Sequence, residues 1–390
     1  MIGKVEQKQS KIQGVNFRLI LYTVALAVIG IFVVRSATAN EPTTSLVSTT
    51  VKQIIGVAAG IVLMAGLMIL DYHKTVKYSA ILYLAAILLL LYLLLFVGAI
   101  SGAKRWIHIP AFGTIQPSEF AKPALLVFLA FLVHKFEEKI SKIYVVALFL
   151  AGAAPVLVLV LMEPDLSTAI VLFLILVSVL FLSGISYKWI IGIGVVLVPI
   201  IIFFIVAVYQ PEQTILNSLL KPHQVERING YFFPNQYPGI VYQQNNSVMA
   251  IGSGGFFGKG LNNSSLESVK NGSFLSEEQC DFIFAVIGEE MGFLGSVIVM
   301  ILLLLISIEC LRIAAACTDT VGRCIAGTVG AVIFLQSFIN IGVATLLLPN
   351  TGIPLPFLSA GLSSLLSSFL MVGLALSVGV HGRIKRRVFY

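Results

Sequence analysis

Ten long apolar runs, separated by polar segments, restrict this chain to a fold that lies within a lipid bilayer. A helix needs about 20 mostly apolar residues to cross the hydrocarbon core. Only 11% of the residues are charged, compared with about 25% in an ordinary soluble domain. We therefore expect an all-α, polytopic integral membrane protein whose single domain covers residues 1–390. The expected transmembrane helices are residues 17–36, 52–70, 79–99, 119–134, 143–162, 167–184, 187–208, 282–308, 325–346 and 357–380.

The lysine and arginine residues predict the orientation of these helices. With ten spans, the basic residues of both termini and of alternate connections fall on one side, which the positive-inside rule identifies as the cytoplasm. The large segment of residues 209–280, between helices 7 and 8, is then extracytoplasmic. We expect a multi-pass protein of the bacterial cytoplasmic membrane with both termini in the cytoplasm. The net charge of +7 then reflects topology and contact with membrane lipids, and no nucleic-acid partner is expected.

Ionisable residues gather on the predicted outer side of the membrane. Such groups at membrane depth usually face a cavity or one another, and they often serve function. Basic groups suit a pyrophosphate, whereas a carboxylate suits a general base or a cation site. The residues are Arg105, Glu119, Lys122, Glu163, Asp165, Lys259 and Asp281.

Several of these residues also have a purely structural explanation. Asp281 and Asp165 could each cap the helix that follows, and for Asp165 this alternative is the stronger one because Pro164 precedes it. Glu119 and Lys122 are three residues apart and could form a local ion pair.

For Arg105 and Glu289, too, a structural role has to be weighed against a functional one. Arg105 stands beside Trp106 and could anchor the chain at the membrane interface. Glu289 lies inside the eighth expected span, about 12 Å along the helix from Asp281. A carboxylate buried there needs a partner, which favours a functional role.

Two glycine-rich segments interrupt the apolar pattern. Residues 247–260 are weakly apolar, which predicts a half-helix at the membrane surface or a re-entrant piece. Three prolines and two glycines within residues 349–361 exclude a regular helix there. Non-helical backbone at a membrane boundary is tolerated where it lines a cavity. We therefore expect residues 349–361 to form one wall of the outer cavity.

Taken in order, motifs along nearly the whole chain resemble those of the shape, elongation, division and sporulation (SEDS) family. The Gly-Lys-Gly and Pro-Asp-Leu variants are more similar to its elongation (RodA) branch than to its division (FtsW) branch. The motifs are Gly102–Ile107 and Gln116–Lys122, Pro164–Ala169, Ala250–Gly260, Asp281–Ala285 with Glu289 and Glu290, and Asn340–Gly342 with Gly352–Phe357 and Ser359.

The resemblance implies a ten-span peptidoglycan glycosyltransferase that polymerises lipid II. It also implies a divalent cation, Mg or Mn, and a class B penicillin-binding protein as transpeptidase partner. The chain departs from the family pattern in two places. Ser276–Cys280 replaces the usual Pro-Glu-x-His-Thr before Asp281, and Ser359–Ser364 replaces Ser-Tyr-Gly-Gly-Ser-Ser.

We interpret Asp281 as the general base, and as a possible ligand of the cation. Arg105, Lys122 and Lys259 are the candidates for holding the pyrophosphate of the substrate. The expected substrate-binding set is completed by Glu119, Asp165 and Glu289.

Two alternatives stay open from the sequence. The chain could be a flippase that moves the lipid-linked precursor, although a transporter site is expected near the midplane rather than on the outer side. It could also be a non-catalytic scaffold that recruits a penicillin-binding protein.

Overall fold

The computed structural model describes residues 14–39, 47–98, 104–109, 113–210, 214–219, 222–262 and 279–382, and these residues form a helical bundle with one small hairpin. The antiparallel hairpin pairs β1 with β2, Ile107 lying opposite Ile115. The elements are α2 (Phe17–Ala37), α3 (Thr49–Ile69), α4 (Tyr72–Lys77), α5 (Ser79–Phe96), β1 (Ile107–Ile109), β2 (Gly113–Ile115), α6 (Pro117–Phe136), η1 (Glu137–Lys139), α7 (Ile143–Met162), α8 (Leu166–Leu182), α9 (Tyr187–Tyr209), α10 (Thr214–Leu219), α11 (Pro222–Phe232), α12 (Pro238–Ser253), α13 (Ile283–Ala316), α14 (Thr320–Ala344) and α15 (Leu362–His381).

Each of the ten expected spans corresponds to a long helix, which confirms an all-α polytopic membrane fold. Seven of the described helices are long and apolar enough to cross a membrane, and α8 is a shorter apolar helix. Three expected boundaries were wrong, and one of them is the start of α14, which lies at Thr320 instead of residue 325. The last span begins at Leu362 instead of residue 357, because the segment before it is irregular, and α13 continues to Ala316 instead of residue 308.

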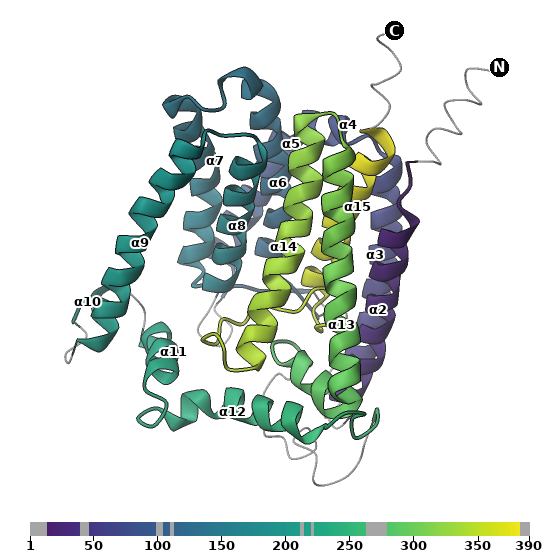
Figure 1. The fold of residues 1–390 in the computed structure, drawn as a ribbon, viewed down its shortest axis with the longest axis vertical. Coiled ribbons are helices and arrows are strands. Elements are labelled where there is room, and N and C mark those ends of the chain that lie inside the picture. Colours follow the sequence, from purple (N-terminus) through teal and green to yellow (C-terminus); the bar gives the residue numbers. More distant parts are fainter. Residues whose placement is uncertain are drawn as a thin grey trace, which may run out of the picture.

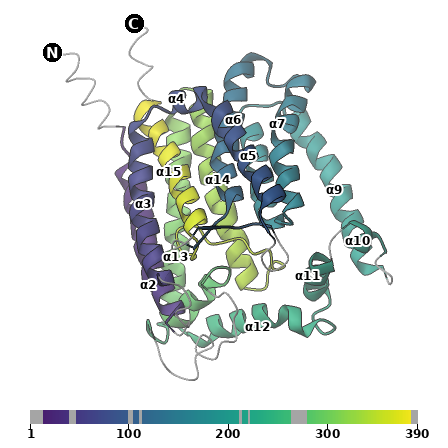
Figure 2. The ribbon, with the colours of Figure 1, turned by 180° about the vertical axis from the view of Figure 1, so that it is seen from behind.

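The long helices stand side by side, and α12 lies across one end of them (Figures 1 and 2). Residues 247–253 form the end of α12, so the first half of the segment 247–260 is helical, and its place relative to the membrane stays a prediction. The described chain begins and ends at the opposite end of the bundle, where Gly14 packs against Gly379. An even number of crossings explains why both ends lie together.

The core sits around α14 and α15, which are the most buried of the apolar helices, whereas α3 and α5 turn a wide face outward. Helices α3 and α15 approach closely because Gly60 lies directly against the Phe369 ring. Small residues permit such close approach between membrane helices. α15 is thereby fixed between α3 and α14, and its first residues stay in a defined position.

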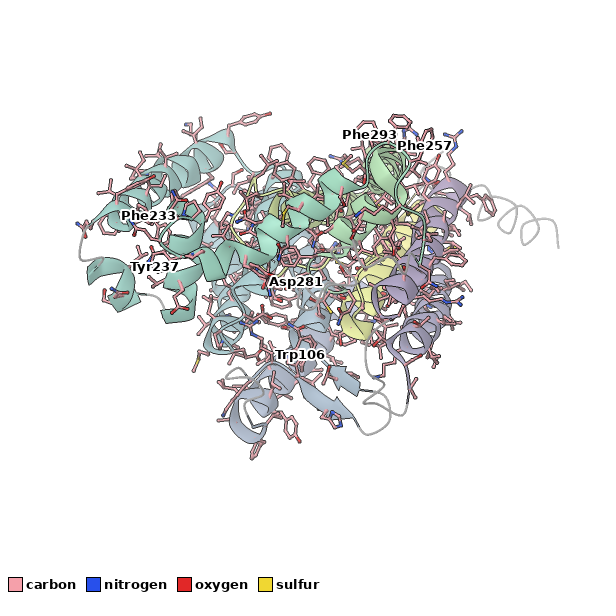
Figure 3. The ribbon with its side chains drawn as sticks, turned by 90° about the horizontal axis from the view of Figure 1, so that it is seen from below. Trp106, Phe233, Tyr237, Phe257, Asp281 and Phe293 are labelled. Carbon is pink, nitrogen blue, oxygen red and sulfur yellow. The ribbon has the colours of Figure 1, made fainter. Side chains whose placement is uncertain are left out.

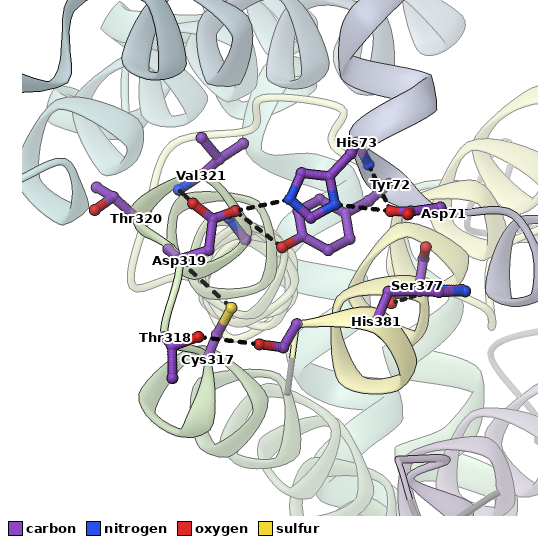
Figure 4. A network of polar contacts seen from close by, with 12 residues as sticks. Asp71, Tyr72, His73, Cys317, Thr318, Asp319, Thr320, Val321, Ser377 and His381 are labelled. Atoms are coloured by element: carbon purple, nitrogen blue, oxygen red, sulfur yellow. Dashed lines mark hydrogen bonds and ion pairs between the residues drawn. The ribbon is translucent and has the colours of Figure 1, made fainter. Parts of the chain in front are cut away.

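A polar network closes the end of the bundle where the chain begins and ends (Figure 4). His73 contacts Asp71 through Nδ1 at 2.8 Å and Asp319 through Nε2 at 3.4 Å. The Tyr72 hydroxyl donates to Asp319 at 2.9 Å. The hydrogen bond to Asp319 raises the pKa of His73, and Asp71 adds to this effect while burial opposes it. The network therefore joins α4 to the start of α14.

Candidate active site

A polar cavity of about 240 Å³ lies at the end of the bundle opposite Gly14 and Gly379. It is formed where α6, α8 and α15 begin and directly before α13. Five of the seven predicted site residues line it, and they come from four separate segments: Arg105, Glu119, Lys122, Asp165 and Asp281.

Asp281 faces this cavity and does not cap α13. The N-cap of α13 is Phe282, and no side chain caps the helix. A Cβ atom added at Gly352 would lie 3.2 Å from Asp281 Oδ2, so the carboxylate rests against that glycine. Figure 3, which looks onto this end, shows Asp281 near the middle of the bundle and Trp106 on the side of the hairpin. The structural alternative for Asp281 was therefore wrong.

Side chains from α14 and from the irregular segment before α15 hold the backbone of Cys280 and Asp281 in place. Asn340 Nδ2 donates to the carbonyl oxygens of Asp281, at 2.9 Å, and Ile353, at 2.7 Å. Ser359 Oγ donates to the carbonyl of Cys280 at 2.6 Å. The prediction that residues 349–361 form one wall of the cavity is confirmed, because Thr351 through Pro354, Ala360 and Gly361 line it.

Glu119 and Lys122 form the predicted local ion pair, with 2.7 Å between Oε2 and Nζ. Each side chain is only 4% exposed, and both line the cavity. A surface pair would contribute little to stability, but a pair in this position is desolvated and expensive to break. The local pair and the proposed substrate contact are therefore compatible.

Asp165 caps α8, as its structural alternative predicted. Its Oδ1 accepts from Thr168 N at 3.1 Å, and its Oδ2 accepts from Gln116 Nε2 at 2.7 Å and Thr168 Oγ1 at 2.8 Å. Ser118 Oγ adds a longer bond at 3.3 Å. Asp165 thus ties the start of α6 to the start of α8, and its main effect is to fix the shape of the cavity.

Arg105 holds the connection between α7 and α8. Its guanidinium donates to the carbonyl oxygens of Glu163, at 3.2 Å from Nε, and Pro164. The Glu163 side chain is fully buried, and neither carboxyl oxygen has a hydrogen-bond partner among the described residues. Burial raises the pKa of Glu163 to about 8, with a further contribution from Asp165 and an opposing one from Arg105. Glu163 does not line the cavity, but its backbone carbonyl accepts from Arg105, which does.

Lys259 and Glu289 do not line the cavity but meet each other, with 2.8 Å between Nζ and Oε1. Glu289 is thus supplied with the partner that a buried carboxylate requires. The segment after α12 reaches α13 because α13 is interrupted at Gly292, whose φ is 66°. Lys259 N and Gly260 N donate to the carbonyl oxygens of Glu289 and Glu290 there, both at 2.9 Å.

Two cavity features were not predicted from the sequence. Gln116 stands directly before Pro117, at the N-cap position of α6, but its side chain does not cap that helix. It donates to Asp165 instead. Gln336, which is 6% exposed, lines the cavity from α14. A glutamine inside an apolar span is unusual enough to have indicated this position.

The family model described as "Cell cycle protein", which covers FtsW, RodA and SpoVE proteins, matches residues 17–384. The chain belongs to this family. It is 32% identical to a probable peptidoglycan glycosyltransferase FtsW of Trichlorobacter lovleyi (strain ATCC BAA-1151 / DSM 17278 / SZ), over 96% of each chain. It is 31% identical to the stage V sporulation protein E of Bacillus subtilis (strain 168), over 94% of this chain and 97% of that protein.

Solved structures of similar proteins agree with the fold. A chain of a peptidoglycan synthase complex matches with a TM-score of 0.75 at 26% identity, over 94% of this chain and 97% of that one. RodA of Thermus thermophilus matches with a TM-score of 0.64 at 24% identity, over 94% of this chain and 96% of that one. The sequence relatives named above are FtsW and SpoVE proteins, and the similarity to RodA at 24% identity shows the fold alone, so the branch within the family stays a prediction.

Proposed function

We propose that this chain is a peptidoglycan glycosyltransferase that polymerises lipid II into glycan strands on the outer face of the bacterial cytoplasmic membrane. The supporting observation is the cavity, which brings Asp281 together with Arg105 and Lys122 at one end of the bundle. Two kinds of relatives carry names that fit, a probable peptidoglycan glycosyltransferase and a sporulation protein.

Polymerisation joins an acceptor sugar to a donor sugar that is linked to a lipid pyrophosphate. The acceptor hydroxyl oxygen bonds to C1 of the donor, the bond from C1 to the pyrophosphate oxygen breaks, and the pyrophosphate keeps the electron pair. The hydroxyl proton goes to Asp281, since a positioned carboxylate is a suitable general base. Lys122 and Arg105 stabilise the negative charge that develops on the pyrophosphate.

The cavity also suits a divalent cation, Mg or Mn, bound together with the substrate. Mg²⁺ is commonly held by one or two carboxylates plus substrate phosphates rather than by a cage of protein ligands. Asp281 is the carboxylate we assign to this role, because it lines the cavity together with Arg105 and Lys122. When bound, the cation would neutralise charge on the leaving pyrophosphate.

The proposal includes an orientation and a partner. The end that carries the cavity faces outward, so both termini are cytoplasmic, in keeping with the basic residues at the other end. A class B penicillin-binding protein would crosslink the strands made here, and the matching chain from a peptidoglycan synthase complex supports such a partner.

Purified chain in detergent, supplied with lipid II and Mg²⁺, tests the proposal. We expect glycan polymer from the parent chain and none from Asp281→Asn, while both keep the same melting temperature. Asn cannot accept the proton, and a general base contributes about 100-fold to 10,000-fold in rate. Polymer formed by Asp281→Asn at the parental rate would exclude Asp281 as the base.

Two other results would replace the proposal. Transfer of lipid II across a vesicle membrane without polymer would identify a flippase. Growth complementation by Asp281→Asn, with no polymer from either purified protein, would identify a scaffold.

A further inference from the structure

A second cavity, of about 540 Å³, opens at the other end of the bundle. It lies between the start of α2, the last turns of α13 and the end of α15. A single water occupies about 30 Å³ of liquid, so this space is large enough for a small polar group. Its polar lining consists of Asn16, Arg18, Glu309 and Arg312.

The charged side chains around this cavity differ in how many ion pairs and hydrogen bonds they form. Glu309, whose side chain is 4% exposed, accepts from Arg312 Nη1 at 2.6 Å and from Asn16 Nδ2 at 2.8 Å. Arg312 is 59% exposed, and among the described residues it uses only this contact for its several donors. Arg18 is exposed and forms no ion pair within the described part of the chain. The cavity therefore presents two cations, of which one is neutralised in part.

The same end of α2 carries exposed apolar side chains. Phe17 is 66% exposed and Leu21, one turn later on the same face, is 64% exposed. Leu311 of α13, which is 46% exposed, lies beside the turn that carries Arg312. Exposed apolar side chains directly next to exposed arginines are expected where the hydrocarbon of the bilayer meets its headgroups.

We propose that this cavity binds the phosphate headgroup of an anionic phospholipid from the surrounding leaflet. Arg18 and Arg312 would hold the phosphate, and Asn16 would donate to it or keep Glu309 in place. The acyl chains would lie along Phe17, Leu21 and Leu311. Basic pockets between transmembrane helices bind lipid headgroups in this way. The site is remote from the polar cavity around Asp281, so the proposal does not depend on the reaction.

Native mass spectrometry of the detergent-purified full chain can measure this binding. The probes are phosphatidylglycerol and phosphatidylcholine with identical acyl chains. We expect preference for phosphatidylglycerol and about a fivefold loss of its affinity in Arg18→Gln, since each basic residue contributes about 1 kcal/mol near an anionic lipid. Arg312→Gln should cause a similar loss. Glu309→Gln should instead strengthen binding, because it removes the charge that competes with the phosphate.

Arg35→Gln is the matched control, because Arg35 is exposed on the same helix about 25 Å away, in the last turn of α2. It should leave the affinity unchanged. Equal binding of both lipids, or unchanged affinity in Arg18→Gln, would overturn the proposal, and so would an equal loss in Arg35→Gln. Displacement of the lipid by millimolar inorganic phosphate would overturn it too, by showing a site for free phosphate.

Discussion

A single methyl group added at Gly352 would test whether Asp281 must keep its present position. The Cβ of Gly352→Ala would lie 3.2 Å from Asp281 Oδ2 and 3.9 Å from Ser167 Oγ. The first distance is shorter than an ordinary van der Waals contact, so the carboxylate has to move by a few tenths of an ångström. Gly352 also has a φ of 72°, which disfavours alanine.

Two separate effects follow from this substitution. The left-handed backbone costs an alanine about 1–2 kcal/mol, which lowers the melting temperature by a few degrees. The displaced carboxylate lowers the rate as well. A misplacement of 1 Å can cost about 100-fold, so a shift of a few tenths of an ångström should lower the rate about fourfold.

Gly184→Ala separates these effects. Gly184 has a φ of 81°, and an added Cβ there meets nothing within 4 Å. It should therefore share the loss of stability but polymerise lipid II at the parental rate. The assay measures polymer formation by purified protein, with the melting temperature of each variant determined in the same detergent. A Gly352→Ala variant as fast as Gly184→Ala would refute the placement of Asp281 at the reacting centre.

Three further predictions concern buried or paired charges. Glu163→Gln should be more stable than the parent at pH 8 and equally stable at pH 4.5. Because burial raises the pKa of Glu163 from 4.5 to about 8, the parent protein loses stability as the pH rises between these values. Thermal unfolding across this range checks the prediction, and parallel curves for the two proteins would contradict it. His73→Gln should destabilise the protein below pH 6.5, because protonated His73 contacts Asp319. This stabilising contribution of His73 is lost as the pH rises through its raised pKa in the folded protein. Unfolding measured at pH 6 and pH 9 checks it, and an equal loss of stability at both pH values would argue against it. Exchanging Glu119→Lys with Lys122→Glu should keep the buried pair and expression but abolish polymer, because the cation leaves its place in the cavity; an active double variant would make the pair purely structural.

The membrane-spanning helices could be predicted because each is a long apolar run, and no competing fold satisfies its backbone in lipid. The start of α15 was misplaced for a physical reason. Residues 357–360 are apolar or small like the helix that follows, but Phe357 has a φ of 66° and Gly361 precedes the first helical residue. Apolar character alone cannot separate a buried irregular wall from the first turn of a helix.

The site was predictable to the extent that its residues lie near helix starts. Glu119, Lys122, Asp165 and Asp281 stand near or just before the start of a helix, and the bundle brings these helix starts to one end, whereas Arg105 precedes strand β1. The pairing of Lys259 with Glu289 was not predictable in this way. It depends on the interruption at Gly292 and on residues 30 positions apart in the sequence.

The carboxylates of the cavity explain why helix N-termini and a cation would both be needed to bind a pyrophosphate there. Among the described residues, the cavity lining carries the carboxylates of Glu119, Asp165 and Asp281 and two cations, Arg105 and Lys122, so the formal charge of these residues alone would repel a pyrophosphate. Asp165 is screened by its helix-capping bonds, but α6 and α15 begin at the cavity without a side-chain cap. Their first amides and dipoles therefore favour an anion there. A divalent cation brought in with the substrate would supply the remaining positive charge, leaving Asp281 able to act next to a phosphate that it would otherwise repel.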